Sequence, residues 1–415
     1  MNSSAQQREG LERNLIAVRI MAFFQVFMVI VPVAVPLFGD RGLDIAEVLE
    51  LQALFGITVV LGEMPSGYFA DLFGRRRALV AGAVFLGIGH SLLVFAHDFA
   101  SLALFEIALG VGVSLISGAD VATLYDSQAA LGHGEVERQR GLGRLFFTRQ
   151  LSEAGAGLAA AGLLLFAGFD ELVFVQMLIG WLPLAFALTI VDPPVERAPS
   201  ASHLENVSEV WRVLFASDEI LRRTFLVMAI WSLSTFYAVW LVQHHLAEGG
   251  TSVEALGIAW AVLAVIGAIS GRQASWLEEA LGAPRLLALV ALLPVLGYVL
   301  FALLPAAWAL LVAPLFWIAR GAGFVVLQGA LNARLEATRR ATVNSLVGFL
   351  FRAVYALSVP LMGAVLRAWS LAEAFLLLAC FSLLIWLCLV APLAGSIRRA
   401  SQWVPAEGLP AEGLE

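Results

Sequence analysis

The sequence contains no lysine, so arginine supplies all 25 of its basic residues. It has 2 cysteines, Cys380 and Cys388, and both stand in the last apolar run, so they do not indicate a disulfide framework. Charged residues make up 14% of the chain, whereas a soluble domain has about a quarter. This scarcity of charge excludes an ordinary soluble domain.

Apolar residues take the place of the missing charges. They account for 60% of the chain, and the mean hydropathy is +0.87. A length of 415 residues accommodates about a dozen membrane spans of ~20 residues with their connections. We predict spans over residues 14–38, 47–69, 78–97, 100–124, 145–167, 171–191, 222–246, 252–276, 284–304, 307–332, 342–366 and 371–394.

The arginines are distributed unequally between the two sets of connections. Most lie on the side that both termini share, and only Arg41 and Arg367 fall on the other side. Because positive residues stay in the cytoplasm, we expect both termini there and an even number of spans. The expected location is a bacterial-type inner membrane.

A polar interruption near the middle divides the chain. We predict an N-terminal segment over 1–13, a six-helix bundle over 14–191, a linker over 192–221, a second bundle over 222–394 and a tail over 395–415. Apolar residues recur at helical spacing in the linker between Leu204 and Phe215, which predicts a short amphipathic helix on the membrane surface. The tail carries a small tandem repeat and is predicted to be disordered.

The segment 67–77 lies between two long apolar runs and carries an acid, two glycines and three arginines, so it must be a turn in water. Its composition resembles the loop between the second and third helices of the major facilitator superfamily. The matching positions are Gly67, Asp71, Gly74, Arg75 and Arg76. The resemblance implies an all-α integral membrane protein with about 12 transmembrane helices in two pseudo-symmetric six-helix bundles.

The resemblance also implies a cytoplasmic gate. Asp71 would cap a helix of the other half, where the helix dipole favours an anion. Arg75 would pair with an acid at the cytoplasmic end of the fourth span, and Asp126 stands at that place. A simple orientation signal is the alternative role for these arginines.

Internal repetition supports the two-bundle plan. Ser275, Glu279 and Gly282 repeat the spacing of the first three signature positions, and the glycine stretches that begin at Gly110 and Gly321 coincide at nearly the same offset. Two residue patterns that repeat at nearly the same offset indicate a duplicated bundle.

Ionisable residues inside spans are costly, about 2.5–3.5 kcal/mol each at the bilayer centre, so they must face a cavity or a partner. The residues concerned are Glu63, Glu106, Asp120, Arg149, Glu153, Arg320 and Arg352. The four acids are candidates for proton coupling, and Glu153 has the most central position. Asp120 and Arg149 could instead form an internal ion pair.

Glu106 stands where the superfamily commonly has an arginine, four residues before Gly110. Apolar surroundings favour the neutral form of a carboxyl, so Glu106 could carry the coupling proton. It could also bind a cationic substrate or lie at the outer headgroup level.

The candidate substrate-binding residues are polar or aromatic side chains within the spans. They are Gln25, Arg149, Arg320, Arg352, Trp231 and Tyr237. For the two aromatic residues, packing is the alternative role.

We therefore expect a secondary active transporter that works by alternating access. Proton-coupled efflux of a small organic or drug-like molecule is favoured, although the fifth span lacks the proline typical of the superfamily's antiporters. The alternatives are a proton-coupled importer of an anionic metabolite and a lipid flippase. The chain shows no nucleophile–base pair or phosphate loop, and no acid or cysteine cluster beside His244 and His245, so no enzyme, metal or cofactor is expected. The expected partners are the substrate, protons and membrane lipids, without nucleic acid, and the expected state is a monomer.

Overall fold

The structure is a computed structural model that describes residues 3–194, 219–335 and 337–402. The described residues form helices and no strands. The first half contains α1 (Ser3–Val26), η1 (Val31–Val33), α2 (Ala34–Asp40), α3 (Ile45–Phe73), α4 (Arg75–Phe95), α5 (Phe99–Ile116), α6 (Ala119–Ala130), α7 (Glu135–Leu164) and α8 (Phe169–Ala187). The second half contains α10 (Glu219–Glu248), α11 (Val253–Leu281), α12 (Ala283–Leu303), η2 (Ala306–Trp308), α13 (Ala309–Val312), α14 (Pro314–Ala333), α15 (Ala337–Ala368), α16 (Leu371–Ile385), η3 (Trp386–Val390) and α17 (Ala391–Gln402).

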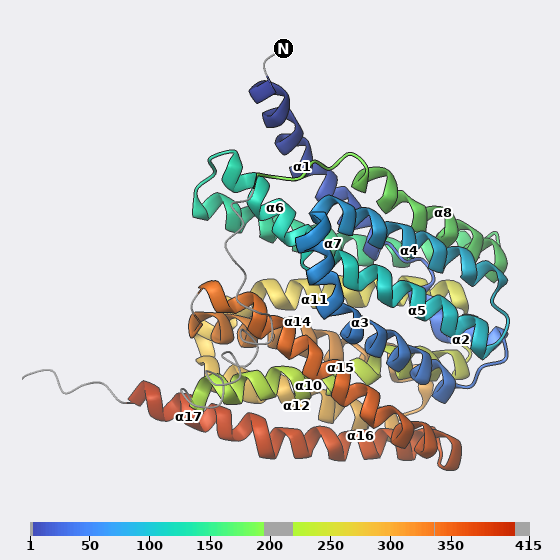
Figure 1. Cartoon of the computed structure of the whole chain (residues 1–415). Helices are drawn as coiled ribbons and strands as arrows, with labels where there is room; N and C mark the ends of the chain where they lie inside the picture. The colour runs from blue at the N-terminus through green and yellow to red at the C-terminus, as the bar shows by residue number, and fades with distance from the viewer. Residues whose placement is uncertain (1–2, 195–218, 336, 403–415) are drawn as a thin grey trace, which may run out of the picture.

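The two halves lie one beside the other, with the helices of both running in roughly the same direction (Figure 1). α3 packs against α15, and α7 packs against α11, so these four helices form the seam between the halves. Both described termini, at the start of α1 and the end of α17, lie at one end of the molecule (Figure 1). We call this the terminal end, and the opposite end, where α2 ends and α3 begins, the far end.

The all-helical membrane architecture predicted from composition is confirmed. Eleven helical segments of the described chain are long and apolar enough to cross a membrane. The predicted span 145–167 corresponds to the second part of α7, which ends at Leu164. This helix is not among the eleven because Arg149, Gln150 and Glu153 lower its hydropathy. α7 nevertheless runs beside α1 and α11, so neighbouring helices cover it and it forms the twelfth member of the arrangement.

The surface helix predicted in the linker and the part of the tail after residue 402 lie outside the described residues. Residues 395–402 of the predicted tail are helical, as the end of α17, so the prediction of disorder is wrong there. The proposed domain boundaries therefore stay a prediction.

The first span differs from the uninterrupted segment predicted over 14–38. α1 ends at Val26, the midpoint of this segment, and a non-helical break precedes η1. Pro32 lacks a backbone N–H, and the neighbouring groups find side-chain partners instead. Val29 N donates to Gln176 Oε1 at 2.7 Å, and Gln243 Nε2 of the second half donates to Val31 O at 3.1 Å. Irregular backbone at membrane depth is tolerated only with such partners.

Two glycine turns at the terminal end confirm the internal repetition. Gly74 joins α3 to α4 with φ 93° and ψ 152°, and Gly282 joins α11 to α12 with φ 77° and ψ 143°. Only glycine adopts this conformation without strain. The predicted repeat thus places the same turn in both halves.

Several helices that begin at the far end have capping side chains. Asp44 accepts from Glu47 N at 2.7 Å, and Ser370 occupies the same position before α16. Asp98 accepts from Ser101, whose hydroxyl and backbone N–H hold the pKa of that carboxyl below its ordinary value. These caps satisfy backbone donors that the helices leave unpaired at their starts.

Candidate functional site

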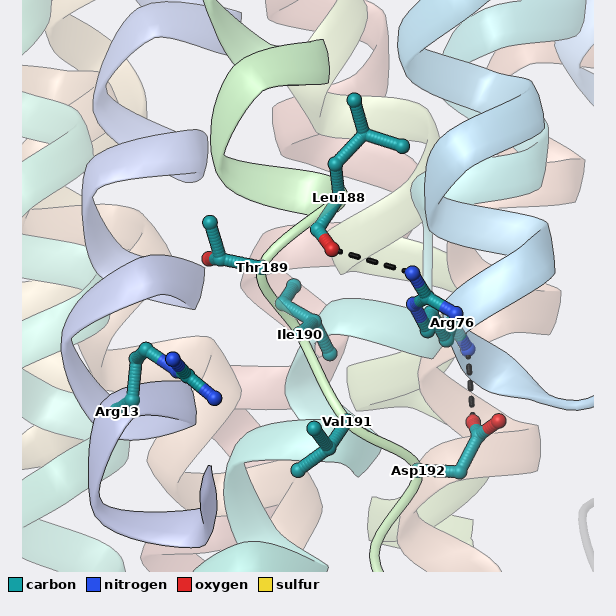
Figure 2. A pocket seen from close by; sticks show the side chains of 7 residues that line it. All are labelled: Arg13, Arg76, Leu188, Thr189, Ile190, Val191 and Asp192. Atoms are coloured by element: carbon teal, nitrogen blue, oxygen red, sulfur yellow. Dashed lines mark hydrogen bonds between the residues drawn. The ribbon is translucent and has the colours of Figure 1, made fainter. Parts of the chain in front are cut away.

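The signature turn lies beside a cavity of about 460 Å³ at the terminal end, lined by Arg13, Arg76 and residues 188–192 (Figure 2). Arg76 Nη2 donates to Leu188 O at 3.2 Å, and the Arg76 backbone N–H donates to Asp192 Oδ1 at 2.9 Å. Asp192 therefore places a carboxylate at the start of α4, where the helix dipole favours it. The sequence placed residue 192 only at the start of the predicted linker and gave no signal of this contact.

Arg75 and Asp126 form an ion pair through Arg75 Nη1 and Asp126 Oδ2, which joins α4 to α6. The structure thus brings together the two residues that the resemblance paired. The Asp71 side chain lies outside the described residues, and a Cβ added at Gly67 would meet nothing within 4 Å. The proposed gate role of these residues stays a prediction.

A second ion pair lies deeper in the first half. Arg149 Nη2 on α7 contacts Asp120 Oδ2 on α6, and the Asp120 side chain is 1% exposed. Asp120 follows the turn at Gly118, where φ is 80° and α5 gives way to α6. The structure therefore forms the internal pair that the sequence left open as an alternative.

A third ion pair crosses the seam. Arg352 Nη1 on α15 donates to Glu63 Oε1 on α3 at 3.0 Å. The two side chains are 27% and 23% exposed, so neither is fully enclosed. A Cβ added at Gly56, nearer the far end of α3, would lie 3.8 Å from Arg352 Cβ and Cγ, which is an ordinary van der Waals contact. These residues were predicted separately, for proton coupling and substrate binding, and not as partners.

Glu106 and Glu153, the two remaining candidate acids, form no ion pair with an arginine among the described residues. Glu106 is 4% exposed and accepts from Gln52 Nε2 at 2.8 Å, so it lies inside the first half and not at an exposed headgroup level. Glu153, half-buried on α7, makes no hydrogen bond or ion pair with any residue that the structure describes. Its neighbour Ser152 donates to Phe23 O at 2.6 Å, which fixes this turn of α7 against α1.

The candidate substrate residues are scattered over both halves. Gln25 lies just before the break in the first span, and its Oε1 atom is buried without a hydrogen-bond partner. Tyr237 OH shares a hydrogen bond of 2.6 Å with Ser358 Oγ. Trp231 is 2% exposed and packs so closely on Gly323 that a Cβ there would come within 2.4 Å of its ring. In this conformation Trp231 is a packing residue.

Arg320 on α14 is exposed and makes no hydrogen bond or ion pair with a described residue. The helix carrying it lies close to α11, because a Cβ at Gly321 would come within 2.2 Å of Gly267 O. Arg320 therefore does not join the Glu63–Arg352 or Asp120–Arg149 pairs.

Several hydrogen bonds and ion pairs join the halves at the level of Glu63 or nearer the far end. Arg367 Nε and Nη2 contact Asp44 Oδ2 at 3.3 Å and Glu50 Oε1 at 3.1 Å. A Cβ at Gly157 on α7 would come within 2.8 Å of the Gly257 carbonyl on α11. The seam is therefore joined at the far end.

This arrangement can hold, release and transfer protons and charged groups, because it combines paired and unpaired carboxyls inside apolar helices. Within the described part of the chain, no group of three or more histidine, cysteine, aspartate or glutamate side chains could hold a metal ion.

Comparison with known proteins adds a family and a fold. The family model described as Major Facilitator Superfamily matches residues 15–335. A mutant of the nucleoside transporter NupG is similar at TM-score 0.76 with 12% identity, over 91% of this chain and 99% of that one. A bacterial homolog of the human lysosomal transporter Spinster, described as inward-facing and unoccupied, has TM-score 0.71 and 17% identity, over 96% and 99% of the two chains. A D-xylose-proton symporter has TM-score 0.70 and 15% identity, over 92% and 96%. No curated protein matches the sequence.

Proposed function

Because the chain belongs to the Major Facilitator Superfamily, we propose that it is a secondary active transporter that exports a small organic molecule in exchange for protons. The transporter alternates between a state open at the terminal end and a state open at the far end. The terminal end faces the cytoplasm, since it carries most of the arginines. In the described state the seam is joined at the far end, so substrate enters from the cytoplasm.

The Glu63–Arg352 ion pair carries this proposal. It is formed when Glu63 is charged and no ligand competes for it, and it holds the two halves in one orientation. Protonation of Glu63, or binding of a cationic group to it, removes the attraction for Arg352. The halves then move readily only when a proton or a substrate is bound.

This rule distinguishes exchange from symport. An exchanger must not change orientation when empty, because an empty return step would let protons or substrate move alone. A symporter must return empty to complete its cycle. An ion pair that restrains the empty protein therefore supports exchange, even though the neighbours of known coupling include a proton symporter.

The charge distribution supports a cationic or neutral substrate. Arg149 and Arg352 are neutralised by Asp120 and Glu63, whereas two further carboxyls within the spans have no arginine among the described residues. The remaining acids attract protons and organic cations. Arg320, which is exposed without a described partner, favours the second candidate, an importer of an anionic metabolite. Arg320→Ala should abolish binding in that case and leave export of a cation nearly unchanged.

The proposal is tested in proteoliposomes with ethidium as a cationic probe and a trapped pH-sensitive dye. The wild-type protein should move ethidium against its gradient when a proton gradient is imposed, and ethidium addition should drive proton movement. Glu63→Gln should let ethidium equilibrate without moving protons. The matched control is Glu12→Gln, which removes an exposed ion pair with Arg8 far from the seam. Tight coupling in Glu63→Gln would contradict the proposal.

A further inference from the structure

A second cavity at the terminal end is independent of the seam and has an excess of positive charge. Its volume is about 140 Å³, and it lies between α1, the end of α6 and the start of α7. Three of its lining side chains are arginines, Arg19, Arg140 and Arg144, whereas Glu137 is the one carboxylate among them.

The arginines of this cavity are not neutralised by the described part of the chain. Arg140 and Arg144 make no hydrogen bond or ion pair there, although they stand four residues apart on one face of α7. Arg19 uses Nε to reach Leu15 O on its own helix at 2.6 Å, so its two terminal nitrogens remain available. Like charges at this spacing repel each other unless an anion lies between them.

Two residues that line the same cavity carry buried polar atoms without partners among the described residues. Gln128 is 5% exposed, and its Oε1 atom has no hydrogen-bond partner. The Nδ1 atom of His133, another lining residue, is also buried and unpartnered. Such atoms are expensive to leave unpaired, so a ligand or ordered water normally satisfies them.

The orientation of the Gln128 amide is fixed by its surroundings. Gln128 Nε2 donates to Glu137 O at 3.2 Å, and a flipped amide would set two acceptors against each other. Gly141 leaves the space that the Gln128 amide occupies, since a Cβ at position 141 would come within 2.5 Å of both amide heteroatoms. Oε1 is therefore an acceptor that requires a donor.

We propose that this cavity binds an oxyanion that also carries an O–H group, of which inorganic hydrogen phosphate is the simplest. The arginines supply the donors that phosphate oxygens accept, and the O–H group donates to Gln128 Oε1. The cavity has the volume of about four to five water molecules at ~30 Å³ each, which suits one tetrahedral anion. Sulfate and the phosphodiester of a phospholipid headgroup carry the charge at neutral pH but lack this O–H group.

The test measures binding to the purified full-length protein in a neutral detergent, without any transport step, so its outcome is separate from that of the proposed exchange. Thermal unfolding is followed while phosphate is added at constant ionic strength. A native-state ligand raises Tm along a saturable curve. Wild-type protein should show such a rise with phosphate. The dissociation constant for sulfate should be about tenfold larger than that for phosphate.

Two variants and a control assign the effect to this cavity. Arg140→Gln with Arg144→Gln should weaken phosphate binding at least tenfold, and both residues are exposed, so the fold should persist. Gly141→Ala keeps all charges but displaces the amide, and it should reduce the preference for phosphate over sulfate. Arg272→Gln with Arg285→Gln removes two exposed arginines of the second half and should change nothing.

Three outcomes would overturn the proposal. One is an equal rise of Tm in all variants, which is a general salt effect. Another is equal affinity for phosphate and sulfate. The third is binding of short-chain phosphatidylglycerol as tight as that of phosphate, which would assign the cavity to lipid headgroups.

Discussion

Removal of the ion pair across the seam should change which end of the transporter is open. Arg352→Gln leaves Glu63 without its partner at 3.0 Å, and Glu63→Gln removes the charge from the other side. The pair is about one quarter exposed, so its worth lies between the ~1 kcal/mol of a surface pair and the ~3 kcal/mol of a buried one. A value of about 1.4 kcal/mol corresponds to a tenfold change in the equilibrium between the two states.

The populations can be read from a distance between spin labels at the terminal ends of α7 and α11. Val136 and Trp276 suit this purpose, because both are exposed and their helices are packed together nearer the far end. The two free cysteines, Cys380 and Cys388, are exposed and can first be replaced by serine. Closure of the terminal end should bring the labels together, and double electron–electron resonance measures both populations.

A double-mutant cycle isolates the interaction itself. Each single variant should increase the short-distance population about tenfold, and the double variant should add little to either. Additive effects of the two variants, or distance distributions identical to wild type, would refute the reasoning. Glu12→Gln again provides the control.

Three further predictions use the same preparations. Arg367→Gln breaks both exposed ion pairs at the far end, and their loss should cost the described state ~0.5–1 kcal/mol. The short-distance population should therefore increase about two- to fivefold. High salt should produce a similar shift in the wild type. Gly157→Ala places a methyl group against backbone of α11 and should lower Tm or open the far end, whereas Gly162→Ala, which meets nothing within 4 Å, should do neither. Glu153→Gln should weaken the dependence of ethidium export on the proton gradient, and unchanged dependence would remove Glu153 from the coupling groups.

The sequence was most informative where contacts are local or follow a family signature. Composition predicts the all-helical membrane fold, and the glycine turn at Gly74 has a counterpart at Gly282 with nearly the same conformation. The pairing of Arg75 with Asp126 followed from the family resemblance, which implies an acid at the terminal end of the fourth span as the partner of Arg75. These relations depend on span order and on the side of the membrane, which apolar runs and arginines specify.

The pairing of Glu63 with Arg352 could not be read in the same way. The two residues are 289 positions apart, and their contact depends on how the two halves dock. Each residue was identified as a costly charge within a span, but several opposite charges at similar depth could have served as its partner. Sequence spacing on one helix does not select among helices of another half.

The break in the first span was missed for a different reason. The residues around Val29 are all apolar, so the hydropathy of the segment is continuous. Pro32 was a local signal, but proline is tolerated in membrane helices. The break is satisfied by Gln176 and Gln243, which come from distant parts of the chain. Glutamines inside apolar runs were the remaining signal, and only Gln25 was singled out.

The central claim is that the empty, charged transporter does not change orientation. Proteoliposomes preloaded with ethidium test it most directly. Ethidium release is measured into three external buffers: one at high pH without substrate, one that contains unlabelled substrate, and one that contains excess protons. The account predicts slow release in the first case and fast release in the other two, with all three equally fast in Arg352→Gln. Equally fast release by the wild-type protein in all three conditions would contradict it.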